Sequence, residues 1–89
     1  EPASIEVYGR KSTVDATLKN LSATGACLAW HKEGFELTTG DLVCLTVELV
    51  KLRKRHKVNA EVVWCSGKEM GVTFIPAEEL VAKFASRSE

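Results

Sequence analysis

The sequence predicts an all-β fold of six short antiparallel strands, arranged as a small barrel or sandwich and followed by a short C-terminal helix. Apolar and polar residues alternate with a period of two through most of the chain, and glycines separate the alternating runs at positions 9, 25, 34, 40 and 67. After Pro76 the apolar spacing becomes that of a helix. The 89 residues are expected to form one domain, 1–89, with a sufficient core and no second domain.

The first half of the chain contains three expected strands. A weak opening strand, 4–9, ends at the turn Gly9-Arg10-Lys11. The second strand, 13–20, and the third, 25–31, each place a row of apolar residues on one face: Val14, Ala16 and Leu18, and then Ala26, Leu28 and Trp30. Each of these two strands is therefore expected to bury one face.

The second half contains the expected strands 41–51, 56–65 and 69–75. Their inner rows are expected to be Val43, Leu45, Val47 and Leu49; Val58, Ala60, Val62 and Trp64; and Met70, Val72 and Phe74. We expect Trp64 and Phe74 to be inner-face anchors whose truncation to alanine costs about 3 to 5 kcal/mol.

The tail is expected to form a helix over 77–86. Acidic residues occupy its first turn and basic residues its end, as the helix dipole favours. One stripe of this helix is apolar and contains Leu80, Val81, Phe84 and Ala85. The stripe could cover an open end or side of the sheet, or form a surface for a second chain, since both uses need the same residues.

Composition argues against several classes of function. Lys plus Arg balance Asp plus Glu at twelve each, so the overall charge gives no sign of a DNA or RNA partner. No apolar run approaches the roughly 20 residues of a membrane-spanning helix, so no membrane insertion is expected. Only His31 and His56 could act as neutral-pH bases, and Ser22 lacks the glycine frame of a nucleophile elbow. We therefore expect no catalytic residues and no enzyme.

The three cysteines are odd in number and widely spaced, which argues against a disulfide framework: Cys27, Cys44 and Cys65. Structural zinc sites use closely spaced ligand pairs, and the chain has none, so no metal or other cofactor is expected. The cysteines are interpreted as reduced thiols of a cytoplasmic protein.

A basic segment, 51–57, joins the expected fourth and fifth strands. If alternation continues through it, Lys51, Arg53, Arg55 and Lys57 share one face. Arg53 and Arg55 would then be accessory contacts for an anion or an acidic surface, as would Arg10 in the first turn. The alternative is a solvated hairpin tip that protects the sheet from edge-to-edge pairing.

The most informative stretch is Asn20-Leu21-Ser22-Ala23-Thr24-Gly25, at the corner between the second and third strands. As a turn, Asn20 and Ser22 would bond nearby backbone groups, and Gly25 would adopt positive φ or leave room for the next strand. As a binding site, Asn20 offers donors and an acceptor to a base edge, Ser22 a hydroxyl to a phosphate, and Gly25 clearance for a flat ring. Spacing alone leaves both interpretations open.

This stretch resembles the Asp/Asn-x-Ser-x-x-Gly signature of PilZ domains, bacterial receptors for cyclic di-GMP. The resemblance extends over nearly the whole chain, through Ala26-Cys27-Leu28-Ala29-Trp30, Gly40-Asp41-Leu42-Val43, Val62-Val63-Trp64 and Glu69-Met70-Gly71-Val72-Thr73-Phe74. It implies a six-stranded β-barrel with a C-terminal helix and a non-catalytic module. It also implies that Asn20, Ser22 and Gly25 bind cyclic di-GMP, and that binding is transmitted to an adjacent domain or protein partner.

The chain departs from the family at one motif. PilZ receptors also use an Arg-x-x-x-Arg motif just before the first strand, and residues 1–5 contain no such motif. The arginines either precede this sequence or are not part of the protein. In the second case the domain is a divergent PilZ domain that binds no nucleotide and acts as an adaptor between proteins. Arg10 and Lys11 are adjacent in a turn and cannot reproduce the spacing of the motif.

Overall fold

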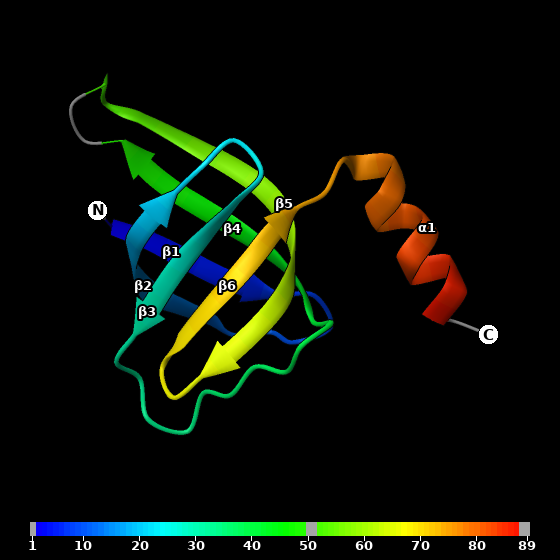
Figure 1. The fold of residues 1–89 in the computed structure, drawn as a ribbon, viewed down its shortest axis with the longest axis horizontal. Helices are drawn as coiled ribbons and strands as arrows, with labels where there is room; N and C mark the ends of the chain where they lie inside the picture. Colours follow the sequence, from blue (N-terminus) through cyan, green and yellow to red (C-terminus); the bar gives the residue numbers. More distant parts are fainter. Residues whose placement is uncertain (1, 50–51, 88–89) are drawn as a thin grey trace.

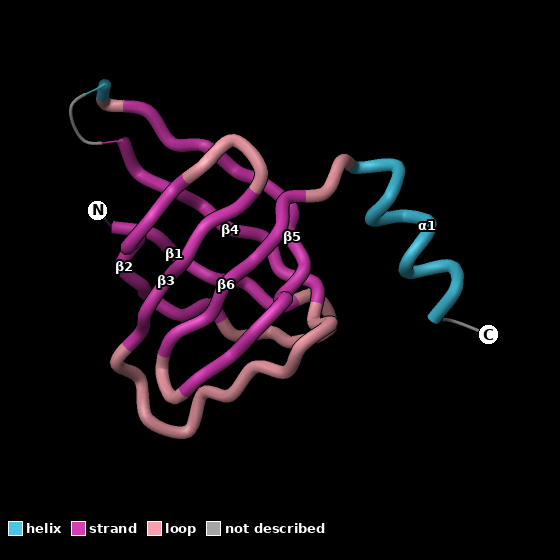
Figure 2. The backbone as a smooth tube through the Cα atoms, viewed as in Figure 1, coloured by secondary structure: helices cyan, strands magenta, loops and turns pink. Residues whose placement is uncertain are grey.

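The structure, a computed structural model, describes residues 2–49 and 52–87. Along the chain it contains β1 (Pro2–Val7), β2 (Thr13–Leu21), β3 (Gly25–Trp30), β4 (Leu42–Leu49), β5 (Lys54–Ser66), β6 (Glu69–Phe74) and α1 (Ala77–Arg87). The strands close into a barrel in the order β1-β2-β3-β6-β5-β4, with α1 beside it (Figure 1, Figure 2). Every neighbouring pair is antiparallel. The predicted six-stranded antiparallel barrel with a short C-terminal helix is therefore confirmed.

Neighbouring strands of the barrel alternate in direction, so the connections between strands are divided between its two ends. β2, β4 and β6 run toward what we call the upper end, which carries the β2–β3 turn (22–24) and the β4–β5 hairpin, both at the top of Figure 1. The lower end carries the β1–β2 turn (8–12), the β3–β4 loop (31–41) and the β5–β6 turn (67–68). Features far apart in sequence are thus gathered at each end.

Most strand boundaries differ from the expected ones by one or two residues. β1 ends before Tyr8, because Arg10 N–H bonds the Val7 carbonyl at 3.0 Å and Gly9 has a φ of 92°. Gly9 therefore already belongs to the turn that was expected to follow the strand. β4 ends at Leu49, and residues 50–51 of the expected fourth strand, including Lys51, lie outside the described residues.

The core fills the interior of the barrel with one alternating row from each strand. The predicted inner rows of β3 and β4 are confirmed at Leu28, Trp30, Val43, Leu45 and Val47, which are all buried. The largest buried side chain is Trp30, whose ring meets Phe35 of the β3–β4 loop edge-on at 5.3 Å. The interior is therefore closed toward the lower end by an aromatic pair.

The inner row of β5 departs from strict alternation, and the prediction for Trp64 is wrong. Ala60 and Val62 are buried as expected, but the β5–β6 register shifts between Val62 and Trp64. Such a bulge moves the following side chain to the other face. Trp64 consequently lies on the outside and is 43% exposed, while Cys65 packs against the core instead. Phe74 is only partly buried, although it does pack against the core.

Helix α1 covers the outside of the barrel rather than an open end. Its buried residue, Leu80, clusters with Leu42 and Ile75, and Tyr8 packs against the same cluster. Phe84 meets the Tyr8 ring edge-on at 5.3 Å. Of the predicted apolar stripe, Val81 remains 65% exposed. Only part of the apolar stripe, Leu80 and Phe84, therefore packs against the side of the barrel.

Candidate functional site

The signature turn is held by its own serine. Ser22 N–H donates to the Gly25 carbonyl at 2.9 Å, and the Ser22 hydroxyl accepts bonds from the amides of Thr24 at 3.3 Å and Gly25 at 3.2 Å. Phe74 N–H bonds the Thr24 carbonyl at 2.9 Å and ties the turn to β6. Serine is favoured at such corners because its short hydroxyl reaches backbone amides two and three residues away.

Gly25 is required by the close approach of two strands. A Cβ placed there would lie 2.2 Å from the carbonyl oxygen of Val72 on β6, closer than any real contact. Gly25 is not among the residues with positive φ, so space rather than backbone conformation explains the glycine. Of the two structural roles expected for Gly25, the structure therefore uses the second, which is room for the adjoining strand.

The turn continues into a row of residues that crosses four strands on the outer wall. Asn20 of β2 pairs with Cys27 of β3, Cys27 with Gly71 of β6, and Gly71 with Trp64 of β5. Directly paired residues project on the same face of a sheet. The row therefore runs across the outside of the barrel from the signature to the displaced tryptophan.

The indole of Trp64 lies over the backbone of Gly71. A Cβ at Gly71 would come within 1.9 Å of the indole nitrogen of Trp64, so only glycine leaves room for the ring. The indole thus packs on bare backbone while 43% of the residue remains exposed. Sequence reasoning missed this role because the alternating pattern of β5 placed Trp64 inside. One signal in the sequence could have indicated this role. Gly71 interrupts an otherwise apolar strand, and a glycine inside a strand often marks a place where another group packs closely on the backbone.

This outer wall is hollowed into an open cavity of about 520 Å³. All three predicted ligand-binding residues, Asn20, Ser22 and Gly25, line it, together with Leu21, Thr24, Ala26, Cys27, Val63, Trp64, Gly71, Val72 and Thr73. None of these residues is acidic or basic. The cavity thus offers an aromatic ring, hydroxyls and amide groups, the combination that suits a flat polar heterocycle.

Two charged residues close to the cavity, Lys19 and Glu69, neutralise each other. Lys19, next to Asn20, donates a hydrogen bond of 2.9 Å to Glu69, and this bond raises the pKa of Lys19. The two side chains are about half exposed. A phosphate in the cavity would therefore need cations from outside its lining.

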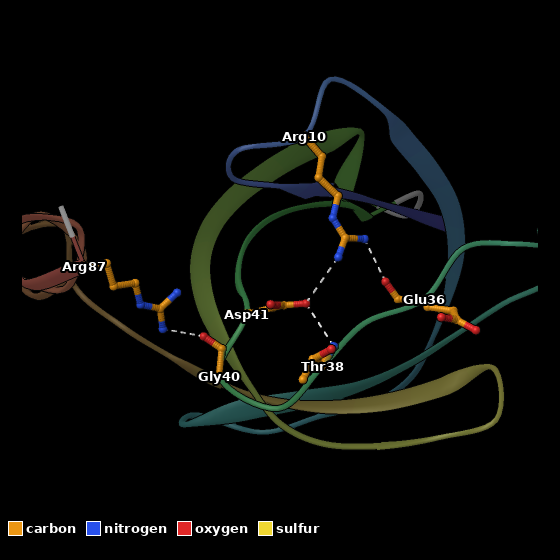
Figure 3. A network of polar contacts seen from close by, with 6 residues as sticks. All are labelled: Arg10, Glu36, Thr38, Gly40, Asp41 and Arg87. Atoms are coloured by element: carbon orange, nitrogen blue, oxygen red, sulfur yellow. Dashed lines mark hydrogen bonds and ion pairs between the residues drawn. The ribbon is translucent and has the colours of Figure 1, made fainter.

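The predicted accessory arginines lie away from the cavity. Arg10 is at the lower end, where it donates to the Glu36 carbonyl at 2.7 Å and lies 3.7 Å from Asp41 (Figure 3). Arg53 and Arg55 belong to the β4–β5 hairpin at the upper end, and neither lines the cavity. Arg53 occupies the turn with a φ of 52°, so it does not continue the alternation of β5.

The cysteines and acids do not form a metal site in the part of the chain that the structure describes. No group of three or more His, Cys, Asp or Glu side chains is placed to hold an ion there. Cys27, Cys44 and Cys65 are all free thiols. Burial raises the pKa of the Cys65 thiol, so that it stays protonated at neutral pH.

Within residues 2–49 and 52–87, no helix has the length and apolar character needed to cross a bilayer.

Comparison with known proteins identifies the family of this chain. The family model of the PilZ domain matches residues 1–84, which is nearly the whole chain. A search of curated proteins found no match. The match spans all six strands and most of α1, and it includes the signature turn and the Trp64 row. The chain therefore belongs to the PilZ domain family, a family of cyclic di-GMP receptors.

Proposed function

We propose that this domain is a non-catalytic receptor for cyclic di-GMP. The observation that carries the proposal is that the signature turn and the exposed indole of Trp64 open onto one uncharged cavity. Asn20 would bond a guanine edge, Ser22 would donate to a phosphate oxygen, and Gly25 would leave its corner of the cavity clear for the ring. Membership of the PilZ family supports this ligand.

Trp64 would supply the stacking surface for a guanine base. Its ring is fixed from behind by Gly71 and is reachable from the cavity, which is the arrangement that base stacking requires. Stacking of a base on an aromatic ring contributes about 1 to 3 kcal/mol. Replacing Trp64 by alanine should therefore weaken binding by about 5- to 150-fold.

The phosphates would need arginines that reach the cavity from outside it. Pro2 pairs with Thr17, three residues before Asn20, so a segment leading into β1 would approach the cavity along β2. This is where an Arg-x-x-x-Arg motif would have to act. Arg53 and Arg55, also at the upper end, are the proposed accessory contacts within the chain, whereas Arg10 would first have to leave Asp41.

Binding would be transmitted through α1. Thr73 lines the cavity and pairs with Glu61 of β5, and Glu61 forms an ion pair of 2.8 Å with Lys83 of α1. A ligand that displaces Thr73 would therefore shift β5, and β5 contacts α1 through the ion pair of Glu61 with Lys83. We expect hydrogen exchange of the α1 amides to change on ligand addition, and to change less in Glu61→Gln.

Calorimetry and NMR with cyclic di-GMP test the receptor proposal. We compare residues 1–89 with a version that carries two arginines, four residues apart, ahead of Pro2, and with a matched extension carrying alanines. The expected result is shift changes at Asn20 to Gly25 and at the Trp64 indole in all three, with markedly tighter binding only for the arginine version. Trp64→Phe should remove the ligand-induced fluorescence change while Trp30 continues to emit.

An absence of heat and of shift changes at the signature in every version would overturn the proposal. The domain would then be a divergent PilZ domain that acts through protein contacts. Shift changes confined to the hairpin would likewise contradict the cavity as the binding site.

A further inference from the structure

The β4–β5 hairpin extends beyond the closed part of the barrel. Pairing of β4 with β5 continues to Leu49↔Lys54, whereas among the described residues pairing of β5 with β6 begins only at Ala60↔Phe74. Pairing of β4 with β1 reaches only Val47 among the described residues, so the hairpin beyond it, Glu48–Leu49 with Lys54–Arg55, is a two-stranded ribbon. The hairpin projects at the upper left of Figure 1 and Figure 2. We call residues 52–57 the basic tip.

Positive charge surrounds the basic tip instead of covering one face. Lys57 pairs with the outward-facing Thr46, whereas Lys54 lies two residues from His56, which pairs with the inward-facing Val47. Alternation therefore places Lys54 and Lys57 on opposite faces of the ribbon. The turn adds Arg53, and the outer face adds Arg55, so that four basic side chains point in several directions, and all are exposed.

The basic tip is poorly neutralised within the protein. Its nearest acid is Glu48, whose carboxylate lies 3.9 Å from Arg55 Nε with both side chains largely exposed. Such a pair contributes little in water. Among the described residues, Arg53, Lys54 and Lys57 have no acidic partner.

An apolar residue sits beside these charges. Leu52 immediately precedes Arg53 and is 65% exposed. A single exposed leucine is ordinary. A leucine at the end of a projecting ribbon ringed by basic side chains is the composition of a surface that meets anionic lipid, with the charges at the phosphates and the apolar residue in the interface.

We propose that the basic tip docks this domain peripherally on an anionic membrane surface. Arg53, Lys54, Arg55 and Lys57 contact lipid phosphates, and Leu52 enters the headgroup region. A layer of headgroups can surround a projecting tip, whereas a flat acidic protein surface would meet only one face of the ribbon. The proposal does not require bound nucleotide, since no residue of the tip lines the cavity. Arg53 and Arg55 would contact either lipid or the nucleotide, but not both at once.

Vesicle flotation of the full chain tests the proposal. The probes are phosphatidylcholine vesicles with and without about one third phosphatidylglycerol. We expect binding only to the anionic vesicles, weakening steeply as salt rises from about 0.05 M to 0.5 M. No binding to anionic vesicles would overturn the proposal and leave an acidic protein as the occupant of the tip.

Charge-reversal variants separate the two geometries. Lys54→Glu and Lys57→Glu, on opposite faces, should each lower vesicle partitioning by at least about fivefold, because each basic residue near an anionic surface contributes about that factor. Lys11→Glu, in the lower-end β1–β2 turn, is the matched control with the same change in net charge, and it should leave partitioning within about twofold.

A loss in only one of the Lys54 and Lys57 variants would indicate a one-faced partner and contradict docking on lipid. An equal loss in Lys11→Glu would indicate unspecific attraction and contradict it as well. Leu52→Ser should lower partitioning several-fold at every salt concentration, and unchanged partitioning would remove the interfacial role of Leu52. Circular dichroism verifies that each variant is folded.

Discussion

The two ends of the barrel use their charges differently. At the lower end the cations bind acceptors of the protein itself: Arg10 meets Asp41 and the Glu36 carbonyl, and Arg87 of α1 donates to the Gly40 carbonyl at 2.5 Å (Figure 3). Lys68 in the β5–β6 turn likewise pairs with Glu33. These contacts fasten the long β3–β4 loop to its neighbours.

At the upper end the polar groups face outward. The signature turn opens onto an uncharged cavity, and three cations of the basic tip, Arg53, Lys54 and Lys57, have no acidic partner among the described residues. The equal numbers of acidic and basic residues in the chain therefore conceal an unequal distribution of charge between the two ends. The charged side chains of the lower end bind other groups of the protein and hold the β3–β4 loop in place. Those of the upper end remain accessible to molecules outside the chain.

The two tryptophans give the largest expected difference between these regions. Trp30 is 2% exposed beneath Phe35, so Trp30→Ala should cost about 3 to 5 kcal/mol of unfolding free energy. Trp64→Ala on the cavity wall should cost about 1 to 2 kcal/mol, because much of its surface stays in water. Denaturant unfolding measures both. Equal losses would contradict the assignment of Trp64 to the outer face.

Two glycines offer the next largest contrast. Gly25→Ala at the upper end should cost about 2 to 3 kcal/mol, since its Cβ would press on the Val72 carbonyl. Gly9→Ala at the lower end meets no atom within 4 Å and should cost only about 1 kcal/mol, from its positive φ. Thermal unfolding of the two variants checks this order, and a reversed order would show that β3 and β6 can separate cheaply.

A smaller effect is expected from paired acids at the two ends. Asp41 accepts a bond from the Thr38 amide at 2.9 Å and faces Arg10, so Asp41→Ala should destabilise the domain by about 1 to 2 kcal/mol. Glu48→Ala in the hairpin should change stability by less than about 0.5 kcal/mol. If urea midpoints shift equally for both variants, the lower-end network does not stabilise the loop as we infer.

The smallest effect concerns pH. Burial, and secondarily the charge of Asp41, raise the pKa of the Cys65 thiol, so the unfolded chain loses this proton first. The resulting stability is present below the ordinary thiol pKa of about 8.5 and is lost as pH rises above it. Cys65→Ala should flatten the decline of stability with pH in this alkaline range. Parallel curves for wild type and variant would show that Cys65 titrates as an exposed thiol.

Much of the fold could be predicted from sequence because period-two alternation and glycine turns are local signals. They located six strands and the change to a helix after Pro76. The inner rows of β3 and β4 followed from the same pattern, since neither strand breaks its alternation in the residues that were assigned.

The outer wall could not be predicted in the same way. Alternation assumes an unbroken ladder, and the bulge after Val62 reverses the faces of Trp64 and Cys65 without any change in residue types. The signature turn was identified by its resemblance to the PilZ motif, but its position beside Trp64 in one cavity depends on β6 lying between β3 and β5. Such long-range pairing leaves no periodic trace in the sequence.

The overhanging hairpin has a further consequence for self-association. Along Lys54–Val58 the backbone of β5 bonds to β4 on one side, while its other edge precedes the first β5–β6 pair at Ala60. An open edge of this kind can recruit the same edge of another molecule, and like charges discourage that encounter. Neutralising those charges would therefore favour pairing of two copies through this edge, and because both copies use the same edge, the association would stop at a dimer.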